Sequence, residues 1–152
     1  MHESDIPRPA VTVAAVVAEG DRYLVVEEVT RAGLRLNQPA GHLEAGEAIA
    51  AAAARETLEE TGYRVRPTAL VGIYRWESPD TGITFIRFAF AADVLAHEPE
   101  RPLDEGIVRA LWLSHAEIVA QRERHRSPLV LRCLDDFRAG RRLPLDIVSE
   151  IG

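Results

Sequence analysis

The sequence predicts an α+β domain, an α/β/α sandwich built around a mixed β-sheet. Three observations lead to this fold class. Apolar, β-branched runs dominate the first half of the chain, a proline-free helical segment interrupts them at residues 47–61, and two shorter helical segments follow later. The chain has 152 residues, 47% of them hydrophobic, with no internal repeat and no low-complexity linker. We therefore expect one domain over residues 5–148.

Five strands are predicted from apolar runs bounded by turn residues: 11–17, 23–26, 69–76, 83–94 and 109–113. The first run is apolar at nearly every position, so both of its faces are expected to be covered. The run at 83–94 is also apolar on both faces, which indicates a central strand. Residues 36–46 break the pattern and are expected to form an irregular loop.

The helices are predicted from their start and stop signals. The segment 47–61 contains no proline or internal glycine, and Gly62 suits a left-handed helix cap. A glutamate three residues after Ser114 forms a capping-box pattern and indicates a second helix. A serine and proline at Ser127 open the last helix, which is expected to end at Gly140.

The composition excludes several kinds of chemistry. All 18 basic residues are arginine, so mechanisms that need a lysine amine, such as a P-loop or a Schiff base, are excluded. Cys133 is the single cysteine, which excludes an intrachain disulfide and a cysteine zinc knuckle. Any chemistry must therefore come from carboxylates, histidines, arginines, hydroxyls or a bound metal.

Charge and hydropathy limit the kinds of molecule that the protein is expected to bind. The net charge is −6, which disfavours nonspecific binding to nucleic-acid polymers. The basic cluster at residues 122–126 is expected to be a solvated helix end. No apolar run approaches membrane-spanning length, and the polar start lacks a secretory signal, so we expect a cytoplasmic protein without a membrane partner. The chain is expected to be a monomer or a homodimer.

The most informative segment is the helix at 47–61. Glu56, Glu59 and Glu60 fall within an arc of roughly 100° on one helix face. The small apolar positions that should pack on the sheet occupy about the same face, so the buried stripe runs into three carboxylates. Arg55 can neutralise one charge at most. A hard divalent cation such as Mg²⁺ would neutralise the remaining negative charge, and the alternative is that these glutamates form a solvated acidic surface.

The full pattern around this helix resembles the Nudix box of the Nudix hydrolase superfamily. All seven fixed positions are present at the right spacing: Gly41, Glu47, Arg55, Glu56, Glu59, Glu60 and Gly62. Two semi-variable aliphatic positions depart from it and carry Thr57 and Tyr63. The resemblance implies the Nudix fold, with a loop–helix–loop catalytic motif over the mixed sheet.

The resemblance also implies roles for the box residues. Glu56, Glu59 and Glu60 would bind Mg²⁺, or Mn²⁺ as a substitute, and the backbone carbonyl of Gly41 would be a further ligand. Glu56 and Glu59 are expected to be catalytic, with Glu56 a candidate general base for the attacking water. Arg55 and Glu47 would form an internal ion pair that orients the helix.

Motifs outside the box resemble the NudJ phosphatase subfamily over nearly the whole chain: residues 11–14, 24–28, 37–44, 85–88 and 126–130. This implies a small-molecule phosphate substrate, such as a nucleoside di- or triphosphate, hydroxymethylpyrimidine pyrophosphate or thiamine pyrophosphate, and release of inorganic phosphate. One departure is Leu36, where an aromatic residue is expected in front of Asn37.

Four residues are expected to contact the substrate: Gln38, Trp76, Arg87 and Glu105. Trp76 either stacks on a base or packs beneath a loop. Arg87 lies inside an apolar strand and needs an anionic partner, either a phosphate or a box carboxylate. Glu105 and its neighbour Asp104 precede the last strand, where they either supply a carboxylate to the metal or form a surface loop.

Two other functions remain open at this point. One is a different Nudix activity, either MutT-like cleavage of nucleoside triphosphates to monophosphate and pyrophosphate or hydrolysis of ADP-ribose. The other is a noncatalytic module that senses a nucleotide, which is disfavoured because every box glutamate is intact.

Overall fold

The computed structural model describes residues 2–152. Within them, seven strands form a mixed sheet in which four strands follow one another in the order β2 (Arg22–Thr30), β1 (Ala10–Glu19), β6 (Thr84–His97) and β5 (Tyr63–Glu77). Strand β3 (Gly33–Asn37) pairs with β2. Two further strands are β4 (Ala40–His42), which pairs with β1, and β7 (Ile107–Ser114), which pairs with β2. The parallel pair is β1 with β6, so the predicted mixed sheet is confirmed.

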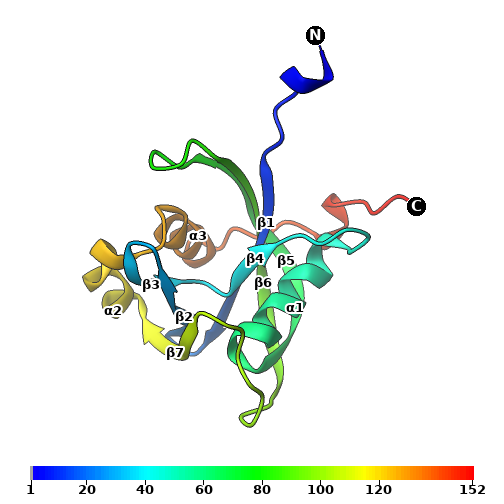
Figure 1. Ribbon diagram of the computed structural model, residues 1–152. Coiled ribbons are helices and arrows are strands. Elements are labelled where there is room, and N and C mark those ends of the chain that lie inside the picture. The colour runs from blue at the N-terminus through cyan, green and yellow to red at the C-terminus, as the bar shows by residue number, and fades with distance from the viewer. Residues whose placement is uncertain (1) are drawn as a thin grey trace.

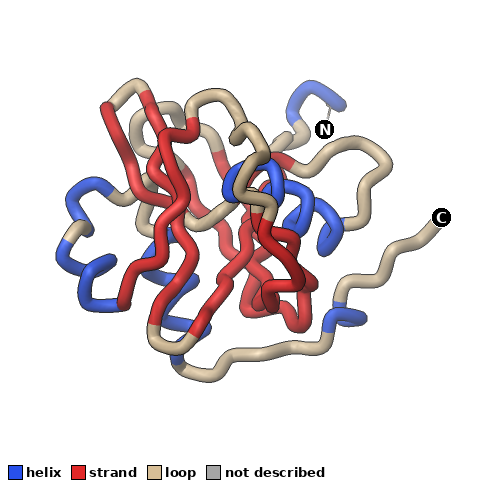
Figure 2. Tube along the Cα trace, turned by 90° about the horizontal axis from the view of Figure 1, so that it is seen from below, coloured by secondary structure: helices blue, strands red, loops and turns tan. Residues whose placement is uncertain are grey.

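Helices cover both faces of the sheet. Helix α1 (Ile49–Thr61) packs on β1 and β5, while α3 (Leu129–Arg138) lies on the other face, close to the short helix α2 (His115–Ala120). Three 3-10 turns lie at Glu3–Asp5, Arg122–Arg124 and Leu145–Ile147. Figure 1 shows α1 and α3 on opposite sides of β1, β5 and β6, and Figure 2 shows the strands between the helices. The layers are those of the predicted α/β/α sandwich.

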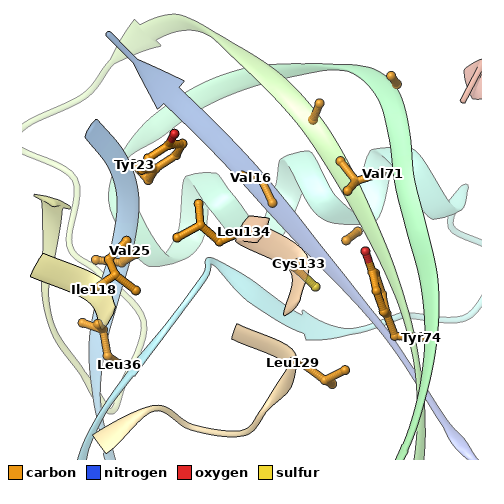
Figure 3. Close-up of a cluster of buried hydrophobic side chains, with 13 residues drawn as sticks. Val16, Tyr23, Val25, Leu36, Val71, Tyr74, Ile118, Leu129, Cys133 and Leu134 are labelled. Atoms are coloured by element: carbon orange, nitrogen blue, oxygen red, sulfur yellow. The ribbon is translucent and has the colours of Figure 1, made fainter. Parts of the chain in front are cut away.

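The core follows from alternation along the central strands. On β1, Val13 packs with the alanines of α1, while Val16 faces the α3 side. Figure 3 shows the α3-side cluster, in which Ile118 lies beside Val25 and Leu36, while Val16, Val71 and Cys133 belong to the same cluster. Both faces of β1 are buried, which confirms the prediction for this strand and assigns Cys133 to the core.

The helix signals in the sequence are confirmed with small shifts. Gly62 caps α1 with φ 78°, and its N–H donates to the Leu58 carbonyl. The capping box at Ser114 is present at the start of α2. Helix α1 begins at Ile49 rather than at residue 47, and α3 ends at Arg138, just before Gly140.

Part of the predicted loop at residues 36–46 is wrong, because β4 lies inside it and β3 ends there. Strand β4 occupies the side of β1 that β2 leaves free, since β1 and β2 pair only around their connecting turn, at Ala18 and Glu19 of β1. The sheet therefore divides between β4 and the β2–β3 pair. Residues from both sides of this division line the main cleft of the molecule.

No helix among residues 2–152 is long and apolar enough to cross a membrane.

Candidate active site

Helix α1 carries the candidate catalytic groups because of how it packs. The small side chains of Ala52 and Ala53 are fully buried and let the helix lie close to the sheet. One turn later the same face carries Glu56 and Glu60, which are 9% and 7% exposed. The predicted continuation of the apolar stripe into carboxylates is therefore present in the structure.

Arg55 connects the loop before α1 to these carboxylates. Its Nε and Nη2 donate to the two carboxylate oxygens of Glu47 at 2.6 and 3.0 Å. Its Nη1 donates to Glu56 at 2.9 Å and to Glu59 at 3.1 Å, and Nη2 also donates to the His42 carbonyl at 3.1 Å. The hydrogen bonds from Arg55 hold the pKa of Glu47 below its usual range. Arg55 thus pairs with Glu47, as predicted, and still leaves excess negative charge on the helix.

Three carboxylates lie close together and form a group that fits a divalent metal, those of Glu56, Glu59 and Asp104. One oxygen from each lies within 4.8 Å of the others. Asp104 precedes β7, and its N–H donates to the Glu59 carbonyl at 2.9 Å, which fixes the loop against the end of α1. Burial and the neighbouring carboxylates raise the pKa of Glu56, although Arg55 opposes this. Oxygen donors from three carboxylates are the ligand type that Mg²⁺ and Mn²⁺ prefer.

Glu60 lies beside this group but is held by the backbone. Its carboxylate accepts a hydrogen bond from the Ala40 N–H at 3.0 Å. Burial raises its pKa to about 9, and the nearby carboxylates of Glu56 and Glu28 add to the effect. Its role as a metal ligand remains a prediction.

Gly41 is in close contact with Glu56. A Cβ built on Gly41 would lie 2.3 Å from the Glu56 carboxyl carbon, so a larger residue would displace that carboxylate. Gly41 is one of three residues of β4, and its partner on β1 is Val13. A glycine at this position lets the backbone approach the carboxylate group, which fits the predicted carbonyl ligand.

The main cleft, of about 670 Å³, reaches from Gly41 across the sheet to the start of α3. Its charged lining residues are Glu28, Arg31, Arg35, Asp80, Arg87 and Arg126. Arginines outnumber acids in this lining, which suits an anionic ligand.

Arg87 is buried in the floor of this cleft and has neutral neighbours. Its Nη1 donates to the Gln38 side-chain oxygen at 3.1 Å, and its Nη2 donates to the Asn37 side-chain oxygen at 3.3 Å. Nη1 also lies 3.9 Å from the Cys133 sulfur. Of the two anionic partners considered from the sequence, the box carboxylate is wrong, because no carboxylate is among the partners of Arg87 in residues 2–152. Arg87 projects on the α3 side of β6, away from α1.

The other predicted substrate contacts lie in different surroundings. Trp76 lines the cleft and stacks on Phe85, with ring centroids 5.8 Å apart. Gln38 is 3% exposed, and its amide also donates to the Val130 carbonyl at 2.6 Å, so it acts on the cleft through Arg87. Glu105 is exposed and belongs neither to the carboxylate group nor to the cleft lining.

The structure decides between residues that the sequence left open and adds others. Asp104 and Glu105 were both candidates for a carboxylate near the metal, and Asp104 joins the carboxylates of α1 whereas Glu105 does not. Asn37 lies next to Gln38 in the same motif, and no local pattern indicated that both side chains would accept hydrogen bonds from Arg87. Of the arginines at 122–126, Arg124 pairs with buried Glu27 at 2.6 Å and Arg126 pairs with Glu28 at 3.1 Å. The expectation of a wholly solvated cluster is therefore wrong.

Comparison with known proteins identifies the family of this chain. The model of the NUDIX domain matches residues 6–133. The chain belongs to the Nudix family. This Nudix hydrolase is 41% identical over 143 residues to the phosphatase NudJ of Escherichia coli strain K12, covering 94% of this chain and 92% of that protein, and equally similar to that of Shigella flexneri.

Solved structures agree with the assignment. A Nudix hydrolase from Nitrosomonas europaea superposes with a TM-score of 0.93 at 51% identity and covers 95% of this chain and 98% of that one. A MutT protein from Methanosarcina mazei Go1 superposes with a TM-score of 0.70 at 22% identity over 91% and 100% of the two chains, which shows the shared fold alone. The Nudix fold predicted from the sequence is confirmed.

Proposed function

We propose that this Nudix hydrolase cleaves phosphoanhydride bonds in small di- and triphosphate compounds and releases inorganic phosphate. The observation that carries the proposal is the carboxylate group of Glu56, Glu59 and Asp104 beside an arginine-lined cleft. The similarity to a protein named phosphatase NudJ supports phosphate as the product. Candidate substrates are nucleoside di- and triphosphates, hydroxymethylpyrimidine pyrophosphate and thiamine pyrophosphate.

Glu56, Glu59 and Glu60, with Asp104 and the carbonyl of Gly41, would hold the metal. Mg²⁺, with Mn²⁺ as a substitute, would offset charge on the phosphate oxygens and supply an activated water. Glu59 is a catalytic residue in this proposal through its carboxylate oxygens, which would orient the reacting groups.

Glu56 is the proposed general base, and its carboxylate would take the proton from the attacking water. Gly41 leaves space for this carboxylate, and Arg55 fixes it with a hydrogen bond of 2.9 Å. The reaction then breaks one P–O bond by attack of water at phosphorus, with no covalent enzyme intermediate.

The cleft would bind the remainder of the substrate. Trp76 lines it and would stack on a base of the substrate, and Arg87 supplies a buried positive charge. Gln38 would position Arg87. A contact from Glu105 would need its loop to move, since this side chain is exposed outside the cleft.

A substrate panel with separate detection of phosphate and pyrophosphate tests this function. The panel contains nucleoside di- and triphosphates, both thiamine-related pyrophosphates and ADP-ribose, with Mg²⁺ present or chelated. We expect Mg²⁺-dependent inorganic phosphate as the first product. Pyrophosphate from a nucleoside triphosphate would instead establish the MutT-like alternative, and no turnover on any compound would favour a nucleotide sensor.

A further inference from the structure

Arg87 is a buried cation without a counter-ion in the described part of the chain. It is 5% exposed and lies on β6, where it pairs across the sheet with Thr12 of β1. Its partners, Asn37, Gln38 and Cys133, are all neutral acceptors. Burying a guanidinium beside neutral groups alone is unfavourable, so a ligand that brings negative charge would be favoured here.

The guanidinium also has unused hydrogen-bonding capacity. It carries five N–H groups, of which Nη1 directs two to Gln38 and Cys133, and Nη2 directs one to Asn37. Among residues 2–152 the Nε–H has no acceptor, but this atom is buried, so the remaining N–H of Nη2 is the donor left for a ligand. Because Asn37 and Gln38 fix the group, a ligand oxygen would meet an oriented donor at little entropic cost.

The surroundings of Arg87 in the cleft are also suited to an anion. Arg35 and Arg126 line the same cleft, together with Ser127 at the start of α3. Glu28 balances Arg126 at 3.1 Å and also accepts a hydrogen bond from the Asn37 amide at 3.3 Å. The hydrogen bond to Glu28 uses the amide N–H of Asn37 and leaves its oxygen to face Arg87. Because Glu28 is not itself a partner of Arg87, the charge of Arg87 remains unbalanced.

The position of Arg87 separates it from the metal-binding carboxylates. Thr12 of β1 lies between Arg87 and His42 of β4 in the sheet register. Glu56 approaches β4 at Gly41 from the α1 side, whereas Arg87 projects on the α3 side. The two sites therefore lie on different sides of the sheet, and the cleft reaches both Arg87 and Gly41, the residue in contact with Glu56.

We propose that the α3 side of the cleft is a metal-independent phosphate subsite, in which Arg87 binds the phosphate that stays on the organic product. The inference rests on the proposed function, because it assigns a second phosphate of the same substrate. The subsite would hold the product monophosphate after inorganic phosphate leaves, and it would favour substrates that keep a phosphate on the organic group.

Binding without metal tests the subsite apart from hydrolysis. Isothermal titration calorimetry in EDTA would measure the affinity of uridine 5′-monophosphate, uridine and inorganic phosphate. We expect the monophosphate to bind at least about 10-fold more tightly than uridine, and Arg87→Gln to remove most of this difference. Arg87→Lys keeps the charge and should retain part of it, which covers the case in which Arg87→Gln does not fold. Arg66→Gln, an exposed arginine on β5, is the matched control and should bind like the wild type.

The outcomes separate this subsite from the proposed function. Equal affinities for uridine and its monophosphate, or a wild-type affinity in Arg87→Gln, would overturn the subsite even if the enzyme hydrolyses pyrophosphates. Binding of inorganic phosphate without the monophosphate would also overturn it, since the site would then belong to the released phosphate. Arg87-dependent binding of the monophosphate by a protein with no hydrolytic activity would support the subsite and refute the proposed function.

Discussion

Gly41 and Glu56 lie so close that a Cβ on Gly41 would be 2.3 Å from the Glu56 carboxyl carbon. The backbone of β4 and the carboxylate of α1 can share this space because residue 41 has no side chain. The three atoms nearest to such a Cβ all belong to the Glu56 carboxyl group, so a methyl group at residue 41 would displace this group.

Gly41→Ala should therefore reduce activity more than stability. We expect a loss of about 100-fold in phosphate release, the usual result of displacing a reacting group by about 1 Å, with a melting temperature within a few degrees of the wild type. Phosphate release and circular-dichroism melting would measure the two effects. Wild-type activity in Gly41→Ala would show that the Glu56 carboxylate need not occupy its position beside β4.

Arg55 is expected to act through the carboxylates that it holds. Arg55→Gln removes its hydrogen bonds to Glu47, Glu56 and Glu59 and should lower activity by about 10- to 100-fold. Arg55→Lys keeps the charge but cannot reproduce the two-oxygen contact to Glu47, so it should restore little. Steady-state kinetics would measure both variants, with Arg66→Gln as an exposed control. Full rescue by lysine would mean that charge alone matters at this position.

Asp104 and Glu105 offer a matched pair of neighbouring acidic residues. Asp104 shares the carboxylate group with Glu56 and Glu59, whereas Glu105 is exposed outside it. Asp104→Asn should weaken Mg²⁺ activation, seen as a rise of about 10-fold or more in the Mg²⁺ concentration for half-maximal activity. Glu105→Gln should leave that concentration unchanged. The reverse ranking would restore Glu105 as the functional residue.

Glu27 predicts how stability depends on pH. It is 3% exposed and pairs with Arg109 and with Arg124. Burial opposes its ionisation, but the hydrogen bonds from the two arginines outweigh burial and hold its pKa below the ordinary 4.5. Because the folded-state pKa is the lower one, Glu27 contributes stability above pH 4.5 and loses it as the pH falls through the folded-state value.

Glu27→Gln should consequently lower the free energy of unfolding at pH 7 by about 1–3 kcal/mol and flatten its acid dependence. Urea unfolding between pH 7 and pH 3 would measure both quantities. Parallel curves for the variant and the wild type would show that Glu27 does not carry this part of the pH dependence.

Local sequence signals predicted the helices well, whereas the extent of several strands depended on long-range pairing. The signals for α1 and α2 lie within a few residues of Gly62 and Ser114, and they matched the structure. Strand β4 was missed because its three residues form a strand only through pairing with β1, which no local pattern reports. Strand β5 extends back to Tyr63 because register shifts on either side of Pro67 let the ladder continue past it.

The candidate active site also has a part that local patterns predicted and a part that depended on long-range packing. The spacing of the glutamates predicted the shared face of α1, since helical geometry is regular. The partners of Arg87 depended on how β3, β6 and α3 meet, so the sequence indicated a need for an anion but not the neutral cradle of Asn37 and Gln38.

In the proposed mechanism, the glutamates of α1 hold the metal that drives phosphate release. Mn²⁺ binding by electron paramagnetic resonance, measured beside Mg²⁺-dependent phosphate release, tests it in Glu59→Gln and Glu60→Gln. We predict that both variants fold with wild-type circular-dichroism spectra, bind Mn²⁺ more weakly and release phosphate at least about 100-fold more slowly. Unaltered Mn²⁺ binding and phosphate release in both variants would show that these glutamates do not hold the metal.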